Sequence, residues 1–145
     1  WIQRQSLAID LGAEFGLGQN HDVIQDIFKA TEGRGVDNSC EFSGSPHALG
    51  NTIHSTRMGG YVNVLSVYGN PTPEVPMNDL VFRYLHLKGI NGRKMWSTWD
   101  KMHALLEAGQ IDVERVLTHR MSIDDFPQAV ELAIEGQCGK VVLDF

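Results

Sequence analysis

Apolar residues along the chain recur at helical spacing in some segments and at strand spacing in others, which is typical of an α/β domain with a parallel sheet. Six helices are predicted. The first is already under way near the start, with Leu7, Ala8 and Leu11 on one face, and the others cover 22–30, 46–57, 79–84, 98–108 and a last segment that carries Phe126. Strands are predicted for four segments, namely 36–42, 61–68, 86–90 and 140–145. The segment 61–68 is apolar on both faces apart from Asn63 and Ser66, as strands buried on both sides are.

Polar residues and glycines mark the expected ends of several elements. Asn20 is the expected N-cap of the second helix, and Asp22 suits the positive end of that helix. The pair Gly59-Gly60 is expected to end the third helix, and Ser122–Asp125 has capping-box spacing ahead of the last one. The segment Ala13–Gly18 has the length of a short strand, although its glycines weaken that interpretation. The apolar residues of the last two helices are expected to face inward: Trp99, Met102, Leu105, Leu106, Phe126, Val130, Ala133 and Ile134.

The composition is that of an ordinary globular chain. Of its 145 residues, 42% are hydrophobic and 21% are charged, so a packed core is feasible. The net charge of -6 opposes binding to a phosphate backbone, so we expect no nucleic-acid partner. No apolar run approaches the ~18 residues of a membrane span, and no signal-peptide pattern is visible, so no membrane association is expected. The two cysteines, Cys40 and Cys138, support neither a disulfide framework nor a zinc site, which makes the cytoplasm the expected location.

Seven short motifs occur in the order in which one family of dehydrogenases has them. They are Gly33-x-Gly-Val-Asp37, Glu41-Phe-Ser-Gly44, Leu87-Lys-Gly-Ile-Asn-Gly-Arg93, Met95-Trp-Ser-Thr-Trp99, Leu117-Thr-His-Arg120, Ser122-Ile-Asp-Asp-Phe126 and Gly139-Lys-Val-Val142. Together they cover the chain almost end to end, and the ordered set resembles the C-terminal portion of the zinc-type medium-chain dehydrogenases. The region of Trp96 and Trp99 is similar to the threonine dehydrogenases of that family, while sorbitol and related alcohol dehydrogenases remain alternatives.

The resemblance implies that residues 1–145 form an incomplete Rossmann-type domain, a doubly wound and mainly parallel α/β sheet that binds a nicotinamide cofactor. We expect Val36–Phe42, Tyr61–Val67 and His86–Gly89 to lie next to each other in that order. In this family a Gly-rich turn binds the cofactor pyrophosphate, and an acidic residue binds the adenosine ribose. Both elements, and the zinc-bearing catalytic domain, would lie upstream, so we expect the chain to be part of a longer protein.

By the same resemblance, the parent enzyme oxidises a secondary alcohol, such as the β-hydroxyl of threonine, by transferring hydride to NAD. Zinc would be held only by the missing catalytic domain, where it polarises the alcohol oxygen. This chain would form one wall of the cofactor cleft and would be inactive alone. The alternatives are a fragment of a sorbitol or other alcohol dehydrogenase, and a non-catalytic module for oligomerisation. The choice of NAD over NADP stays open, because it rests on the missing acidic residue.

Candidate cofactor-lining residues fall at the ends of predicted strands, where open α/β sheets bind ligands. They are Ser43, Leu65, Ser66, Val67, Ile90 and Asn91. By resemblance, residues 65–67 and 90–91 contact the nicotinamide end, and the alternative is that they are plain core residues. Arg4 matches a basic residue that follows the ribose-binding acid, so it either contacts the adenosine ribose or is a solvated helix residue. We expect no catalytic residue in this chain.

Other conspicuous residues favour structural roles. Gly16-Leu-Gly18 lacks a clear preceding strand, so a loop is the better interpretation than a phosphate site. Lys140 matches a pyrophosphate-binding cation of related alcohol dehydrogenases, but a surface lysine at a strand end is the simpler interpretation. The six histidines show no His-x-x-x-His pattern and no cysteine at ligand spacing, so no metal site is expected. The residues Asp124 and Asp125 fit helix caps better than catalytic carboxylates.

The resemblance also implies a homo-oligomer, either a dimer or a tetramer. In the family, the last parallel strand of one subunit commonly extends the sheet across a two-fold axis, which would place His86–Gly89 at the interface. The strand Val36–Phe42 would lack its family neighbour, and an unpaired strand edge favours association. The remaining partner of the parent enzyme would be its small-molecule alcohol substrate.

Overall fold

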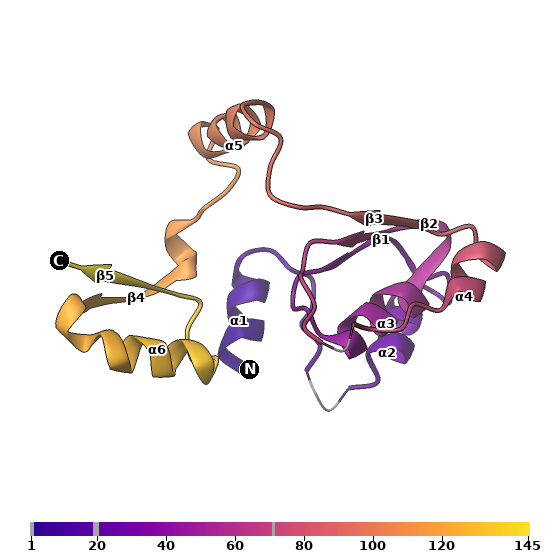
Figure 1. Ribbon diagram of the computed structural model, residues 1–145, viewed down its shortest axis with the longest axis horizontal. Helices are drawn as coiled ribbons and strands as arrows, with labels where there is room; N and C mark the ends of the chain where they lie inside the picture. The colour runs from indigo at the N-terminus through magenta and orange to yellow at the C-terminus, as the bar shows by residue number, and fades with distance from the viewer. Residues whose placement is uncertain (1, 19–20, 71) are drawn as a thin grey trace. The chain divides into compact units, whose positions relative to one another are not determined.

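The computed structural model describes residues 2–18, 21–70 and 72–145. The chain divides into two compact units, His21–Gly92 and the combination of Trp1–Asn20 with Arg93–Phe145. Figure 1 labels the elements of both. Each unit has its own parallel sheet. The predicted α/β class with parallel strands is therefore confirmed.

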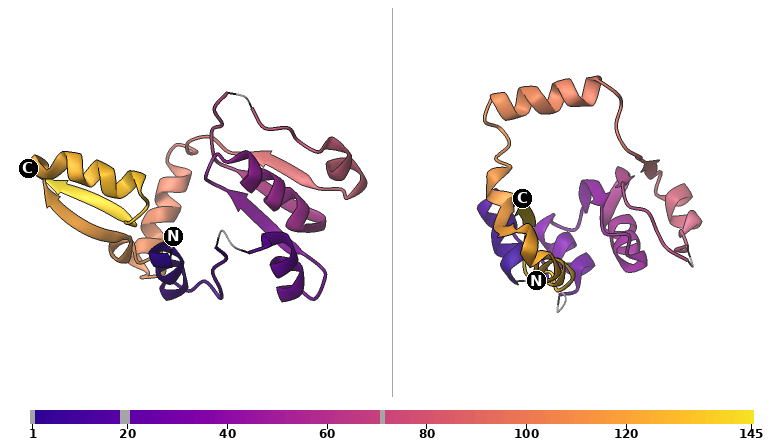
Figure 2. Two further views of the ribbon diagram at one scale, coloured as in Figure 1. Left: turned by 90° about the horizontal axis from the view of Figure 1, so that it is seen from below. Right: turned by 60° about the vertical axis from the view of Figure 1, so that its left-hand side comes forward.

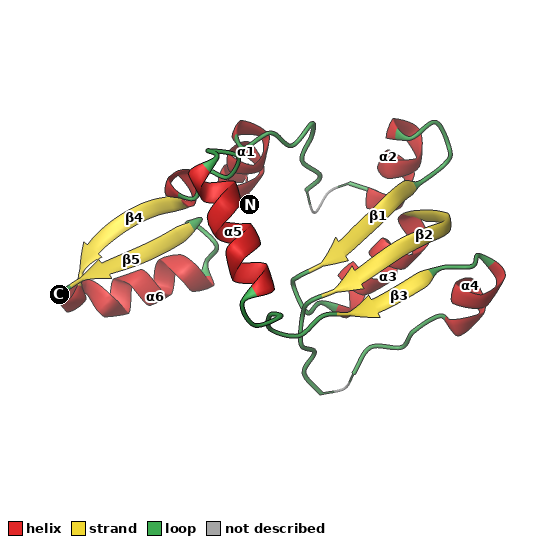
Figure 3. Ribbon diagram, turned by 90° about the horizontal axis from the view of Figure 1, so that it is seen from above, coloured by secondary structure: helices red, strands yellow, loops and turns green. Residues whose placement is uncertain are grey.

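The unit His21–Gly92 is built on a three-stranded sheet with the order β1-β2-β3 (Figure 3). Its elements are α2 (Val23–Ala30), β1 (Val36–Glu41), α3 (Pro46–Ser55), β2 (Thr56–Val64), α4 (Met77–Phe82) and β3 (His86–Gly89). Both strand pairs are parallel, so the three carboxyl ends lie at the same edge of the sheet. The predicted order of these three strands is correct.

Helix α3 supplies the core of this unit. Leu49 and Ile53 on α3 and Val62 on β2 are buried together, and α2 lies on the same side of the sheet as α3 (Figure 1). The opposite face is more open, since Tyr61 is 46% exposed and stacks on His86 with 4.4 Å between ring centroids. The prediction that this strand is buried on both sides is therefore wrong within the unit, because the helices cover one face only.

Strand β2 begins at Thr56, earlier than predicted, and Gly59-Gly60 lies inside it rather than at the end of a helix. The register between β1 and β2 shifts at this point. The end of α3 is capped by a residue distant in sequence, because the guanidinium of Arg83 binds carbonyl groups that a helix end leaves unpaired. These carbonyls belong to Ile53, at 3.2 Å, His54, at 3.3 Å, and Thr56.

The second unit contains a parallel strand pair with a helix packed along it, as the left view of Figure 2 shows. Its elements are α1 (Ile2–Asp10), α5 (Ser97–Glu107), the 3-10 turns Glu114–Val116 and Ile123–Asp125, β4 (Leu117–Ser122), α6 (Phe126–Ile134) and β5 (Lys140–Asp144). Strand β4 was not among the predicted strands. Its partner β5 agrees with the predicted closing strand.

Two local predictions are wrong, and a third concerns a residue outside the described ones. The carboxylate of Asp22 caps α2 by accepting the N–H of Gln25 at 3.2 Å, while the predicted cap, Asn20, lies outside the described residues. The segment Ala13–Gly18 forms no strand, as its glycines already indicated. The Ser122 hydroxyl accepts the N–H of Asp124 at 3.3 Å, so it caps the short 3-10 turn ahead of α6 rather than α6 itself.

The apolar faces of α5 and α6 are more exposed than predicted. Trp99 on α5 is 53% exposed, and on α6 Phe126 is 54% and Ile134 80% exposed. The residue that α6 buries is Ala129, whose small side chain lets the helix approach its strands closely. Among the described helices, none has the length and apolar content needed to cross a membrane.

Candidate functional site

Three loops meet at the carboxyl edge of the sheet in the unit His21–Gly92. Residues 42–45 follow β1, residues 65–68 follow β2, and residues 90–91 follow β3. Backbone bonds hold the loops to the sheet, because the N–H of Leu65 donates to the Glu41 carbonyl and that of Ile90 to the Val64 carbonyl, each at 2.9 Å. Such an edge is where open α/β sheets bind ligands.

The structure brings six of the seven predicted site residues to this edge. They are Ser43, Leu65, Ser66, Val67, Ile90 and Asn91. The interpretation of Leu65–Val67 as part of a strand is wrong, because β2 ends at Val64. These residues form the loop that follows the strand, in which Val67 is 89% exposed and Leu65 39% exposed. The backbone of Ser66 and Val67 is therefore not hydrogen-bonded into the sheet.

The seventh residue, Arg4, lies on α1 in the other unit. Its Nε donates to the carbonyl of Cys138 at 3.0 Å, and its guanidinium packs beside Gly136. This contact fixes α1 to the turn between α6 and β5. The predicted contact of Arg4 with a ribose stays a prediction.

The best-defined polar group at the carboxyl edge is the side chain of Glu41, the last residue of β1, which is only 2% exposed. Its Oε1 accepts the N–H of Ser43 at 2.7 Å, the hydroxyl of Ser43 at 2.6 Å and the N–H of Gly44 at 3.1 Å. Its Oε2 accepts the hydroxyl of Tyr68 at 2.6 Å and that of Ser66. In the sequence, Glu41 stood out only as part of a family motif. The available signal was an acidic residue at the end of a predicted strand, followed closely by Ser and Gly.

These bonds set the protonation state of the site. Burial would raise the pKa of Glu41, but hydrogen bonds from Ser43, Ser66 and Tyr68 outweigh it and lower this pKa from 4.5 to about 2. The carboxylate is therefore ionised at neutral pH. Burial, and then the bond to Glu41, raise the pKa of Tyr68, so the Tyr68 hydroxyl keeps its proton and donates it.

Two predicted cofactor-lining residues direct their hydroxyl protons to Glu41. A hydroxyl has one proton to donate, and those of Ser43 and Ser66 both point to the carboxylate. The Ser43 oxygen also accepts the N–H of Ser45 at 3.1 Å. Toward a ligand these two hydroxyls can therefore act only as hydrogen-bond acceptors.

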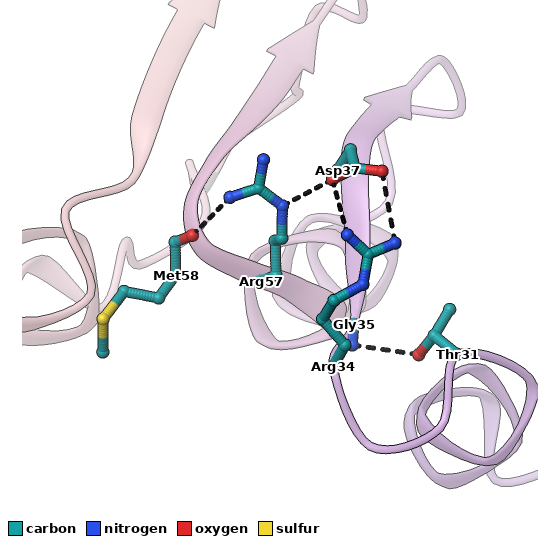
Figure 4. Close-up of polar contacts among 6 residues, drawn as sticks. All are labelled: Thr31, Arg34, Gly35, Asp37, Arg57 and Met58. Atoms are coloured by element: carbon teal, nitrogen blue, oxygen red, sulfur yellow. Dashed lines mark hydrogen bonds and ion pairs between the residues drawn. The ribbon is translucent and has the colours of Figure 1, made fainter.

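A second polar cluster lies at the amino ends of β1 and β2, the opposite end of the sheet (Figure 4). There the carboxylate of Asp37 accepts from Arg34 at 3.1 Å and from Arg57, and the bond from Arg57 lowers the pKa of Asp37. The N–H of Gly35 donates to the Thr31 hydroxyl at 2.9 Å. The cluster is exposed and lies away from the loops that follow the strands, so it stabilises the turn into β1.

The side chains of the described residues do not form a zinc site. Across residues 2–18, 21–70 and 72–145, no three His, Cys, Asp or Glu side chains lie close enough to hold a metal ion. The oxygens of the buried carboxylate, Glu41, are already occupied by hydrogen-bond donors.

Comparison with known proteins settles the family. Residues 3–108 match the family described as zinc-binding dehydrogenase. The chain belongs to this family. The L-threonine 3-dehydrogenase of Bacillus licheniformis is 39% identical, over 97% of this chain and 41% of its own length. That of Pyrococcus horikoshii is 33% identical, over 96% of this chain and 40% of its own length. The family resemblance of the sequence motifs is confirmed, and the chain spans about two fifths of these curated relatives.

Solved structures agree with this assignment. The 2R,3R-butanediol dehydrogenase from Bacillus subtilis has a TM-score of 0.85 and 26% identity, covering 100% of this chain and 42% of its own. The benzyl alcohol dehydrogenase from Acinetobacter calcoaceticus has a TM-score of 0.86 and 20% identity, covering 99% of this chain and 40% of its own, and it shares the fold. The predicted Rossmann-type class is therefore confirmed.

Proposed function

We propose that this chain is part of the cofactor-binding domain of an NAD-dependent oxidoreductase that oxidises a secondary alcohol, such as the β-hydroxyl of threonine. Membership of the zinc-binding dehydrogenase family supports the reaction class. Similarity to L-threonine 3-dehydrogenases supports the substrate class. The cofactor supplies the redox chemistry. The phosphate loop and the zinc-bearing domain belong to other parts of the parent enzyme, which we expect to be cytoplasmic.

The convergence of Ser43, Leu65–Val67 and Ile90–Asn91 at one sheet edge is the observation that carries this proposal. A nicotinamide ring needs an apolar surface with a few polar groups beside it. The exposed side chains of Leu65 and Val67 offer the first. The hydroxyl oxygens of the loops and their backbone groups offer the second. Since the N–H groups of Leu65 and Ile90 are used within the sheet, these two residues contact a cofactor through their other atoms.

Titration with NADH, followed residue by residue in the NMR spectrum, tests the proposal. We expect saturable shifts in the amide signals of Leu65–Val67 and Ile90–Asn91 as NADH rises to about 10 mM, a range that detects millimolar affinity. The signals of Arg34 and Asp37, at the opposite end of the sheet, serve as the control and stay constant. Shifts confined to other regions, or no saturation, would count against a cofactor wall here.

An oligomerisation module is the second candidate, and one observation favours it. Strand β3 is an edge strand of the described sheet, and all four of its residues are exposed. An open edge of this kind pairs readily with another chain. The NADH titration separates the two candidates, because a module without a cofactor cleft would show no saturable response.

A further inference from the structure

The hydrogen bonds that the loop after β2 donates all go to one residue of the neighbouring strand. Within the described part of the chain, residues 65–68 donate three hydrogen bonds, and all three end on Glu41. The N–H of Leu65 donates to the Glu41 carbonyl at 2.9 Å, and the hydroxyls of Ser66 and Tyr68 donate to its carboxylate. Glu41 therefore fixes this loop in both its backbone and its side chains.

The two carboxylate oxygens together bind both loops, and the N–H of Gly44 is shared between them, at 3.1 Å from Oε1 and 3.3 Å from Oε2. Oε1 accepts three bonds from Ser43 and Gly44, in the turn after β1. Oε2 accepts the two hydroxyls of the loop after β2. One buried charge therefore joins two loops that are more than twenty residues apart in sequence. Breaking such a link costs more than making it contributes, because the buried donors left behind have no partner.

Gly44 brings the two loops into contact. Its φ of 73° lies in the left-handed region, and a Cβ at this position would approach the carbonyl oxygen of Val67 to 2.9 Å. The loop after β2 therefore lies directly on the backbone of the turn after β1. Any side chain at Gly44 would displace Val67.

We propose that Glu41 is a positioning residue, which holds Leu65–Val67 in the shape that forms the nicotinamide-side wall of the cofactor cleft. The inference rests on the proposed function. Glu41 does not touch the cofactor itself, since its carboxylate is buried and surrounded by donors from the protein. It acts by keeping the exposed loop beside it in one conformation. Preorganisation of this kind strengthens binding by lowering the entropy lost when the ligand binds.

The variant Glu41→Gln keeps the size of the side chain but replaces one acceptor oxygen with an NH2 donor. The hydroxyls of Ser66 and Tyr68 would have to turn around to accept from it, which weakens the link. We expect NMR order parameters of residues 65–68 to fall from the rigid value of about 0.85 toward the flexible range below about 0.6. The strand residues of β2 stay rigid, which separates a local effect from unfolding. We expect NADH affinity to fall about tenfold.

The matched control is Glu74→Gln, which removes the same charge from an exposed position of the same unit and leaves both measurements unchanged. Tyr68→Phe and Ser66→Ala each remove one donor and should give smaller effects in the same direction, and they carry the test if Glu41→Gln does not fold. Unchanged order parameters in all three variants overturn the positioning role. If the loop becomes flexible but NADH affinity stays at the wild-type value, the proposed effect of Glu41 on cofactor binding is overturned. The proposed function is tested by the NADH titration of the wild-type protein and the positioning role by the variants, so a failure of one is distinguished from a failure of the other.

Discussion

A buried carboxylate is tolerated only where donors surround it, and Glu41 gains its donors from two loops at the carboxyl edge of the sheet. The same hydrogen-bond donors therefore make the burial of Glu41 possible and lower its pKa. The side chain stays charged in the folded protein under conditions in which most glutamates are protonated. This makes the folded state sensitive to acid.

Acid should destabilise the protein through Glu41. The folded pKa of about 2 lies below the ordinary value of 4.5, so the stabilisation is complete above pH 4.5 and is lost as the pH falls from 4.5 toward 2. The shift corresponds to about 3 kcal/mol of unfolding free energy at neutral pH. We expect Glu41→Gln to be less stable than wild type at pH 7 and to lose less stability between pH 4.5 and pH 3. Urea unfolding at several pH values measures both.

Asp37 titrates in the same direction, because its pKa is also lowered. Its contribution is present in wild type and in Glu41→Gln alike, so the difference between the two curves isolates Glu41. Parallel curves for the two proteins between pH 4.5 and pH 3 would show that Glu41 carries no such contribution.

At the scale of single residues, the sequence predicted which residues lie at the edge but not what their side chains do. Ser43, Ser66 and Ile90 were placed correctly, because strand ends can be located from apolar runs and from the family motifs. The direction of the Ser43 and Ser66 hydroxyls depends on Glu41, which contacts Ser66 across 25 positions of sequence. No local pattern carries that information.

At the scale of elements, strand existence and order were predictable, whereas several boundaries were not. The apolar run of β2 is visible in the sequence, whereas β1 and β3 are mostly polar and lie in or beside the family motifs. The parallel order of the three strands follows from the family fold. The end of α3 was predicted two residues too late, and the contact that caps it comes from Arg83, which follows α4 and is distant in sequence. Gly59-Gly60 suggested a helix stop, but it lies within β2, where the register with β1 shifts.

The open edge of β3 should mediate association. The Ile90 N–H points toward β2, and amides alternate in direction along a strand, so the Leu87 N–H points away from β2. We expect a dimer or larger assembly by light scattering. Leu87→Pro removes an outward N–H and should weaken association about tenfold, because proline cannot donate to a partner strand.

Leu87→Ala is the matched control, because it shortens the same side chain and keeps the N–H. Association that survives in Leu87→Pro, or a wild-type monomer at high concentration, would exclude this edge as the interface. Equal weakening by both variants would assign the effect to the leucine side chain and not to strand pairing.

At the scale of the whole molecule, many apolar side chains are exposed, among them Phe42, Phe82 and Trp96. The chain also spans only about two fifths of its curated relatives. The sequence motifs predicted the family correctly, because they are spread over the whole chain in a fixed order.

The chain alone should not work as a dehydrogenase. Hydride transfer needs a cofactor held rigidly against a polarised alcohol, and the described residues offer no metal site. They do supply loops at the nicotinamide side, but the pyrophosphate of a dinucleotide is normally anchored by N–H groups at a Gly-rich turn. Losing a few charge-assisted hydrogen bonds, at ~1.5–3 kcal/mol each, weakens binding by several powers of ten.

We therefore expect NADH affinity no better than about millimolar and no measurable threonine oxidation, with or without added zinc. NADH fluorescence measures the affinity, and the appearance of NADH absorbance from NAD and threonine measures turnover. Zinc is added in a parallel series, because activity that depends on zinc would mean that the chain binds the metal through residues other than a cluster of three or more His, Cys, Asp or Glu side chains among the described residues. Micromolar NADH binding, or turnover by this chain alone, would mean that its loops perform functions we assign to the rest of the enzyme.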